Sequence, residues 1–196
     1  MKNKRGVVKN FIIYKPYGVL SQFRSNDSKQ QSKQFLGSLG DFPKETMAIG
    51  RLDEKSEGLL LLTTDGKLSD FINSKKIEKE YYAQLDGDIT FEAISKLVTG
   101  VQIGLNGKKY KTKPCKVFKL EEVPDLPKRS KKIRDDRHGP TSWISVTLNE
   151  GKFRQVRKMT SAVGFPTLRL IRVRVGKIQL GKMEVGAVIE VPEIDV

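Results

Sequence analysis

A run of four leucines, Leu59 to Leu62, is the most apolar stretch of the sequence and directly follows the polar segment GRLDEKSEG. Such a run is too short for a helix or a membrane span, so it predicts a buried β-strand. A tight turn at 54–58 precedes it, which would place Asp53 on a rigid loop at the edge of a sheet. Reactive groups are usually held in such places, fixed in geometry and open to a substrate. The alternative is structural: Asp53 caps a helical turn that Gly58 ends.

Patterns of strands and helices continue on both sides of this segment. Residues 9–23 predict two strands around a Lys-Pro-Tyr-Gly turn, followed by a polar surface excursion at 24–46 with a short helix at 34–36. Alternating or aromatic patterns predict further strands at 81–85, 143–148, 168–175 and 185–191. Helical spacing predicts helices at 68–73, 90–99 and 152–163. The residues expected to face the core are Phe91, Ile94, Leu97 and Val98 in the second helix and Phe153, Val156, Met159 and Val163 in the third.

The region 151–174 holds seven basic residues and no acidic one. Within it LRLIRVRV, residues 168–175, alternates so regularly that we expect one face of the strand to be buried and the other to be positive. Basic residues without a local counter-charge need an external partner or a distant carboxylate, and Asp53 is a candidate. The alternative is a solvated basic face.

The overall charge points to a polyanionic partner. Lys and Arg number 37 against 23 acidic residues, a formal net charge of +14, and nucleic acid is the partner that fits best. Neither an amphipathic segment, a lipidation motif nor an N-terminal apolar run is present, so we expect no membrane partner. The single cysteine, Cys115, excludes an internal disulfide and favours a cytoplasmic location.

The length of 196 residues suits one domain, residues 1–196, and the patterns favour an α+β fold with two lobes around a basic cleft. Asn106-Gly107 predicts a hairpin, and six lysines lie between 108 and 119. Residues 121–140 have no apolar periodicity and predict a flexible charged loop, with an exposed His138. One His and one Cys are too few for a usual metal site, and no glycine-rich phosphate loop occurs, so we expect neither metal nor cofactor.

Four separated motifs resemble those of the RsuA-like branch of pseudouridine synthases. GRLDEKSEGLLLLTTDGKL is similar to the catalytic signature G-R-L-D-x-x-S-x-G-L-L, with Thr64 where Asn is usual. EGKFRQVRKM resembles a second motif, with Lys152 in place of Arg. Lys79-Glu80-Tyr81 and LRLIRVRVG match two more, and together the motifs occur in the expected order across most of residues 11–191.

The resemblance implies a mixed, largely antiparallel sheet with flanking helices. It also implies isomerisation of a specific uridine in large-subunit (23S) ribosomal RNA by a cytoplasmic monomer, without metal or cofactor. The similarity is greatest to the type that lacks an N-terminal S4 RNA-binding domain, because the catalytic domain here begins by Lys9. Asp53 would be the catalytic residue, whether it attacks the ribose, adds to the uracil ring or removes a ribose proton to give a glycal.

The resemblance assigns supporting roles residue by residue. Arg157 would pair with Asp53 and favour its charged form. Tyr81 would stack on the uracil and remove the C5 proton, and Leu170 would pack on the other side of the ring or serve as a plain core residue. Arg51 would lie near the flipped nucleotide. The expected RNA contacts are Arg51, Lys79, Lys152, Arg154, Lys158 and Arg172.

Two other functional classes remain open at this point. A non-catalytic RNA-binding protein of ribosome assembly would explain the charge, but it would not need the Gly-Arg-Leu-Asp turn. A nucleoside glycosidase would use Asp53 with Glu54 or Glu57, although carboxylates within one turn cannot easily flank a glycosidic bond.

Overall fold

The computed structural model describes residues 7–74, 77–134 and 136–196. Residues 1–6 lie outside the described residues, and they form most of the N-terminal stretch in which no apolar run was found. Asp135, in the predicted 121–140 loop, also lies outside them. Within the described ranges no helix has the length and apolar character needed to cross a bilayer.

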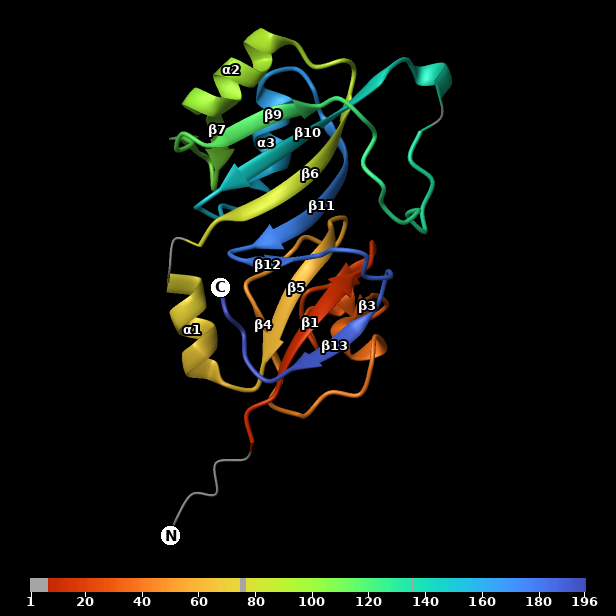
Figure 1. Ribbon diagram of the computed structural model, residues 1–196, viewed down its shortest axis with the longest axis vertical. Helices are drawn as coiled ribbons and strands as arrows, with labels where there is room; N and C mark the ends of the chain where they lie inside the picture. Colours follow the sequence, from red (N-terminus) through yellow and green to blue (C-terminus); the bar gives the residue numbers. More distant parts are fainter. Residues whose placement is uncertain (1–6, 75–76, 135) are drawn as a thin grey trace.

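A nine-stranded sheet runs through the whole protein (Figure 1). Its path is β13-β1-β5-β11-β6-β10-β9, with β4 paired to β5 and β12 paired to β11. The pairing of β11 with β5 is parallel, and the other described pairs in this sheet are antiparallel, which confirms the predicted largely antiparallel sheet. The strands are β1 (Asn10–Lys15), β4 (Met47–Ile49), β5 (Glu57–Thr63), β6 (Lys79–Asp86), β9 (Lys116–Leu120), β10 (Thr141–Leu148), β11 (Thr167–Val175), β12 (Ile178–Gln179) and β13 (Val188–Val191).

Three α-helices pack around the described part of the sheet: α1 (Gly66–Ser74), α2 (Phe91–Thr99) and α3 (Gln155–Ala162). In Figure 1, α2 and α3 lie beside the half of the sheet that contains β6, β9 and β10. Helix α1 lies beside the half that contains β1, β4 and β5. One buried cluster is centred on Leu85, Ile144 and Met159, and two others share β5, of which one also includes Trp143 of β10. This agrees with an α+β fold of two lobes.

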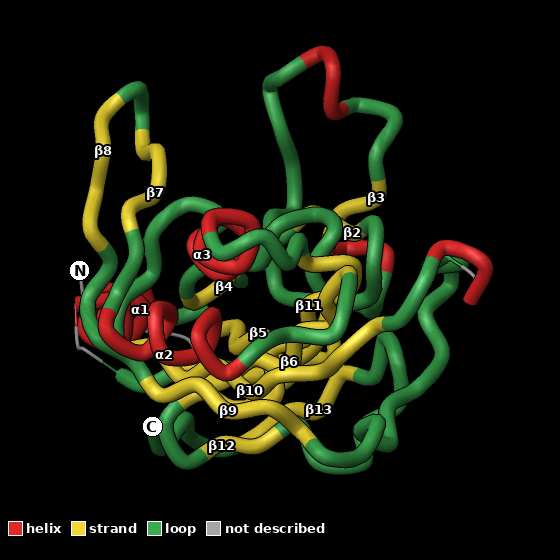
Figure 2. Tube along the Cα trace, turned by 90° about the horizontal axis from the view of Figure 1, so that it is seen from above, coloured by secondary structure: helices red, strands yellow, loops and turns green. Residues whose placement is uncertain are grey.

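Two projections extend from the same side of the sheet, on either side of α3 (Figure 2). One is the hairpin of β7 (Gln102–Leu105) and β8 (Lys108–Lys111), which confirms the turn predicted at Asn106-Gly107. The other is the excursion predicted at 24–46. It contains the 3-10 helix η1 (Ser28–Gln30), the short strand β3 (Gln34–Phe35), which pairs in parallel with β2 (Val19–Leu20), and η2 (Leu36–Ser38). Gln34 and Phe35 therefore lie in a strand, and the short helix predicted at 34–36 was wrong.

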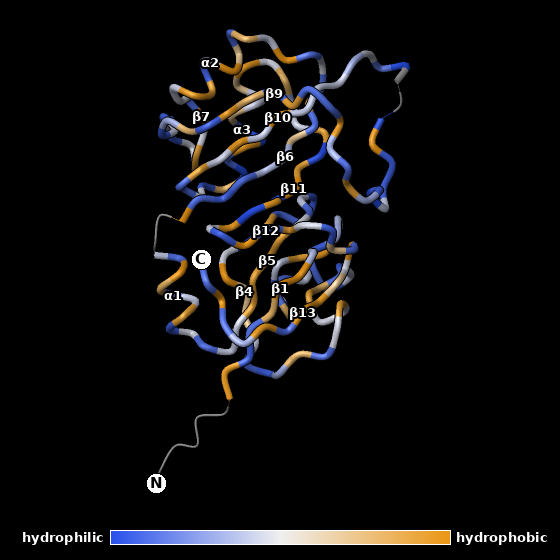
Figure 3. The backbone as a smooth tube through the Cα atoms, in the orientation of Figure 1, coloured by the Kyte–Doolittle hydropathy of each residue, from blue (hydrophilic) through white to orange (hydrophobic). Residues whose placement is uncertain are grey.

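Strand β5 confirms the prediction from the leucine run. All its residues are buried, and hydrophobic residues run along it in Figure 3. The turn before the strand covers Asp53 to Ser56, whose ends are joined by the Ser56 amide donating to the Asp53 carbonyl at 3.0 Å. Gly58 already belongs to the strand. The alternative in which Gly58 ends a helical turn was therefore wrong.

The predicted helices exist, but parts of their apolar faces were wrong. Phe91 and Phe153 are 79% and 68% exposed, and Phe153 precedes α3. Helix α3 begins three residues later than predicted because Arg154, its N-cap, has a left-handed backbone with φ of 53°. The other predicted core residues are confirmed: Leu97, Val156 and Met159 are buried, and Ile94, Val98 and Val163 pack against the same cluster. Ala93 is buried there as well.

The described part of the segment between β9 and β10 is irregular apart from η3 (Asp136–His138), and His138 is exposed, as predicted.

Candidate active site

A cavity of about 500 Å³ lies where the Asp53 turn meets β6, β11 and the start of α3. It joins segments more than one hundred residues apart in the sequence. Most of the residues predicted for the site line it: Arg51, Asp53, Lys79, Tyr81, Lys152, Arg154, Leu170 and Arg172. Arg157 and Lys158 lie outside this lining.

The turn that carries Asp53 is fixed by backbone contacts. The buried Ser21 hydroxyl donates to the Leu52 carbonyl at 2.8 Å and accepts from the Leu52 amide at 3.0 Å. On the other side, the Gly18 amide donates to the Glu54 carbonyl at 2.8 Å. These bonds hold the backbone on both sides of Asp53, whose own side chain is 22% exposed and faces the cavity.

Gly58 allows β11 to approach this turn closely. Its φ is +102°, and a Cβ at this position would lie 2.3 Å from the Arg172 carbonyl oxygen. Only glycine tolerates both the conformation and the contact. The close parallel pairing of Gly58 with Arg172 brings Leu170 and Arg172 to the cavity beside Asp53.

Arg154, not Arg157, is the arginine nearest to the Asp53 carboxylate. Its Nη1 lies 3.5 Å from Asp53 Oδ2. The ion pair that the described residues show for Asp53 is with Arg154, although the Asp53 charge also acts on Arg157, so the pairing of Arg157 with Asp53 stays a prediction. The left-handed backbone at Arg154 turns its side chain away from the direction it would take on a regular helix, and no residue pattern indicates that.

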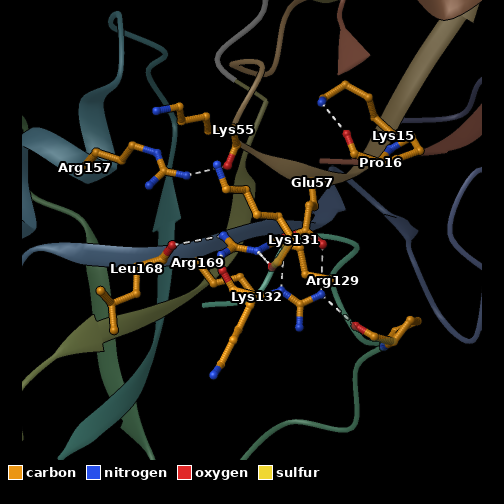
Figure 4. A network of polar contacts seen from close by, with 11 residues as sticks. Lys15, Pro16, Lys55, Glu57, Arg129, Lys131, Lys132, Arg157, Leu168 and Arg169 are labelled. Atoms are coloured by element: carbon orange, nitrogen blue, oxygen red, sulfur yellow. Dashed lines mark hydrogen bonds and ion pairs between the residues drawn. The ribbon is translucent and has the colours of Figure 1, made fainter. Parts of the chain in front are cut away.

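Arg157 instead fastens the backbone around the site. Its Nη2 donates to the Lys55 carbonyl at 2.7 Å, as Figure 4 shows, and its Nη1 donates to the Thr167 carbonyl at 3.2 Å. Burial, followed by the neighbouring Arg154, lowers the pKa of Arg157. Arg157 thus ties the turn after Asp53 to the first residue of β11.

Tyr81 and Leu170 lie on the paired strands β6 and β11 and face the same cavity. Tyr81 is half-buried and packs against two core clusters. Leu170 is 5% exposed and belongs to the core around Val156 and Met159. It therefore lines the cavity and is also a core residue, while its packing on a uracil ring stays a prediction.

The basic residues expected to bind RNA differ in how accessible they are. Arg51 and Lys152 are exposed at the cavity, and the Lys152 ammonium lies 5.2 Å from the centre of the Tyr110 ring. Lys158 lies against the β7–β8 hairpin, where its Nζ donates to the Gly104 carbonyl at 2.7 Å. Lys79 is half-buried, and burial, with Arg172 nearby, lowers its pKa.

Arg172 does not form a positive outer surface. Its side chain is buried, and its Nε donates to the Leu59 carbonyl at 2.7 Å. Arg169 is buried too, and it forms a bidentate ion pair with Glu57 at 2.9 and 3.0 Å. The prediction of a positive face on this strand was wrong, because internal acceptors and one buried carboxylate satisfy these arginines.

Two structural features near the site were not predicted from the sequence. Lys15 is fully buried, and its Nζ donates to the carbonyls of Pro16 and Val19 at 2.7 Å. The other is the Glu57–Arg169 ion pair. The Lys-Pro-Tyr-Gly turn was a signal for Lys15, but nothing in a single sequence distinguishes Glu57 from the exposed acids around it.

The chain is also similar to known proteins. The family model for RNA pseudouridylate synthase matches residues 9–162. The chain is similar to ribosomal large subunit pseudouridine synthase E of Xanthomonas campestris pv. campestris, 41% identical over 89% of this chain and 91% of the relative. It is also similar to the protein of the same name from Vibrio parahaemolyticus, 38% identical over 91% and 71% of the two chains.

Among solved structures, the chain is similar to a pseudouridylate synthase crystal structure with a TM-score of 0.72, at 26% identity over 94% of this chain and 70% of the other. A second likeness, to a chain in a Cbf5-Nop10-Gar1 complex, has a TM-score of 0.52 at 17% identity, covers 87% of this chain and 50% of the other, and shows the fold alone.

Proposed function

The chain belongs to the RNA pseudouridylate synthase family, and on that basis we propose that it converts one specific uridine of large-subunit (23S) ribosomal RNA to pseudouridine with Asp53 as the catalytic residue. The observation that carries this proposal is the position of Asp53. Its carboxylate faces a cavity of about 500 Å³ beside Arg154, Tyr81 and Leu170. This volume is within the usual range for a small-molecule pocket, which suits one extruded nucleotide.

The reaction exchanges an N-glycosidic bond for a C-glycosidic bond, so the detached uracil must turn without leaving the site. Attack on the ribose, addition to the ring and removal of a ribose proton all require an ionised Asp53. The Arg154 guanidinium supplies a positive charge beside it. Tyr81 and Leu170 offer an aromatic and an apolar surface for the two faces of the ring, and Tyr81 would take the C5 proton.

The engagement of neighbouring carboxylates argues against a nucleoside glycosidase that uses Asp53 with Glu54 or Glu57. Glu57 is buried in its ion pair with Arg169, and Glu54 pairs with Lys33 at 2.6 Å. The burial of Glu57 and the contact of Glu54 with Lys33 disfavour either as the second carboxylate of such an enzyme.

The substrate part of the proposal rests on the relatives named for the ribosomal large subunit. The net charge of +14 fits a ribosomal RNA partner. The proposal places the protein in the cytoplasm as a monomer that needs no metal or added cofactor. The lone Cys115 suits such a reducing compartment.

The test uses ribosomal RNA from a strain that lacks this gene. The purified protein is incubated with this RNA, and pseudouridines are mapped before and after. One new pseudouridine in the large-subunit RNA is expected. An unchanged map, with protein that is folded and RNA that is intact, would overturn the proposed function.

A further inference from the structure

Three basic residues from separate segments are drawn near the Asp53 turn in Figure 4, outside the cavity lining. Lys55 lies two residues after Asp53, Arg157 comes from α3, and Lys131 comes from the irregular segment between β9 and β10. Arg157 bonds to the Lys55 carbonyl, and in the view of Figure 4 the Lys131 side chain points from its loop toward this region. Lys55 and Lys131 are exposed.

The nearby carboxylates are already engaged by other cations. Asp53 lies beside Arg154, Glu54 pairs with Lys33, and Glu57 pairs with Arg169. Within the described ranges, neither Lys55 nor Lys131 has a carboxylate partner. A bound anion would supply the counter-charge that these two lysines lack.

The loop that carries Lys131 is held in place by one arginine. Arg129 donates from Nε to the Lys131 carbonyl at 2.7 Å and from Nη2 to the Lys132 carbonyl at 3.1 Å, which closes the loop on itself. Its Nη1 donates to the Leu168 carbonyl of β11 at 3.3 Å. Its guanidinium also lies 4.7 Å from the centre of the Tyr17 ring, in the Lys-Pro-Tyr-Gly turn.

These contacts place the loop beside Arg157. Arg129 and Arg157 donate to the carbonyls of Leu168 and Thr167, which are consecutive residues at the start of β11. A further bond, from Arg169 Nη2 to the Pro127 carbonyl at 2.7 Å, holds the base of the loop. The backbone of Lys131 is thus held near the start of β11, which Arg157 joins to the turn that carries Asp53.

We propose that Lys55, Lys131 and Arg157 form a phosphate site for the RNA strand adjacent to the flipped uridine, and that Arg129 is the positioning residue that holds Lys131 there. The proposal rests on the proposed function for its choice of RNA as the anion. Arginine suits the positioning role because its planar fork bonds several carbonyls at once, which a lysine cannot reproduce. The RNA backbone would thus be held on the opposite side of the Asp53 turn from the β7–β8 hairpin.

The test measures affinity for a ribosomal RNA fragment against salt concentration. The variant Lys55→Ala/Lys131→Ala is compared with Lys177→Ala/Lys182→Ala, which removes the same charge from exposed positions around β12, on the side of the sheet opposite α3 (Figure 2). The first variant is expected to bind roughly tenfold more weakly and to reduce the slope of log affinity against log salt by about 1.5, as two lost phosphate contacts require. The second should bind like the wild type.

Two further variants separate charge from position. Lys131→Arg keeps the charge and should keep most of the affinity. Arg129→Lys keeps the net charge but loses the fork, so it should weaken binding in the same direction as the loss of Lys131.

Equal affinity and equal salt slope in the two double variants would overturn the phosphate site. Wild-type affinity in Arg129→Lys would overturn the positioning role. If the two double variants have equal affinity and salt slope but the wild-type protein modifies the ribosomal RNA, only the phosphate site fails and the proposed function stands. Wild-type protein that modifies no uridine would instead contradict the proposed function.

Discussion

Arg154 Nη1 lies 3.5 Å from Asp53 Oδ2, across 101 residues of sequence. Asp53 is held by a turn and Arg154 by the left-handed start of α3, so the pair depends on the tertiary structure rather than on any local motif. This pair sets the charge next to the proposed catalytic group, and it separates the role of Arg154 from that of Arg157.

Arg154→Ala should lower kcat/KM roughly 100-fold, because Asp53 loses its nearest cation and its fixed orientation. The melting temperature should change little, since both side chains are partly exposed. Arg157→Ala should lower the melting temperature as well as turnover, because it releases the turn at Lys55 and the start of β11. Full turnover in Arg154→Ala, with loss confined to Arg157→Ala, would restore Arg157 as the partner of Asp53.

Arg169→Met should destabilise the protein by about 3–5 kcal/mol, because it leaves the Glu57 carboxylate buried without a partner. The double variant Glu57→Leu/Arg169→Met removes both charges and should recover a large part of that loss. Urea unfolding of the three proteins checks this. A double variant less stable than Arg169→Met alone would show that the ion pair is not what stabilises this part of the sheet.

Gly58→Ala should destabilise the protein by roughly 3 kcal/mol, because the new Cβ would clash with the Arg172 carbonyl at a φ that favours glycine. Gly104→Ala is the matched control, since Gly104 also lies in a strand but has no atom within 4 Å of its Cβ position. Thermal melting of both variants is the measurement. Equal melting temperatures would refute the close approach of β5 and β11.

Burial lowers the pKa of Lys15 to about 7, from an ordinary value of 10.5. Between these values the unfolded chain holds a proton that the folded protein has lost, so folding stability rises with pH in this window. Relative to Lys15→Met, the free energy of unfolding of the wild type should rise from pH 7 toward pH 10.5 and stay level below pH 7. Urea titrations of both proteins across this range measure the difference. A constant difference would place the pKa of Lys15 near its ordinary value.

The sequence allowed much of the fold to be predicted, because hydrophobic pattern and turn chemistry act locally. Leu59 to Leu62 form a buried strand, Asn106-Gly107 turns a hairpin, and Gly100 ends α2. The prediction of a positive face on the strand at 168–175 failed for a physical reason. A basic residue opposite an apolar face is normally solvated, but Arg169 and Arg172 are buried against Glu57 and a backbone carbonyl that lie over one hundred residues away.

The same distinction applies to the site. One cavity is lined by Asp53, Tyr81 and Leu170, the residues that the family motifs indicated. The choice between Arg154 and Arg157 could not be made from sequence, because it depends on one positive φ that a non-glycine residue rarely adopts. Lys15 and Arg129 donate to backbone carbonyls, which every residue has. Such contacts therefore leave no recognisable pattern in the sequence.

Turnover by Asp53→Asn tests the central claim most directly. The amide keeps the size of the side chain and removes its charge, and it is a poor nucleophile and a negligible base, so the fold should survive while catalysis does not. Folding is confirmed by circular dichroism and melting temperature, and tritium release from C5-labelled uridine in ribosomal RNA measures turnover. A folded variant that binds the RNA like the wild type and releases no tritium above background is the predicted result. Near wild-type release from the folded variant would contradict the assignment of Asp53 as the catalytic residue.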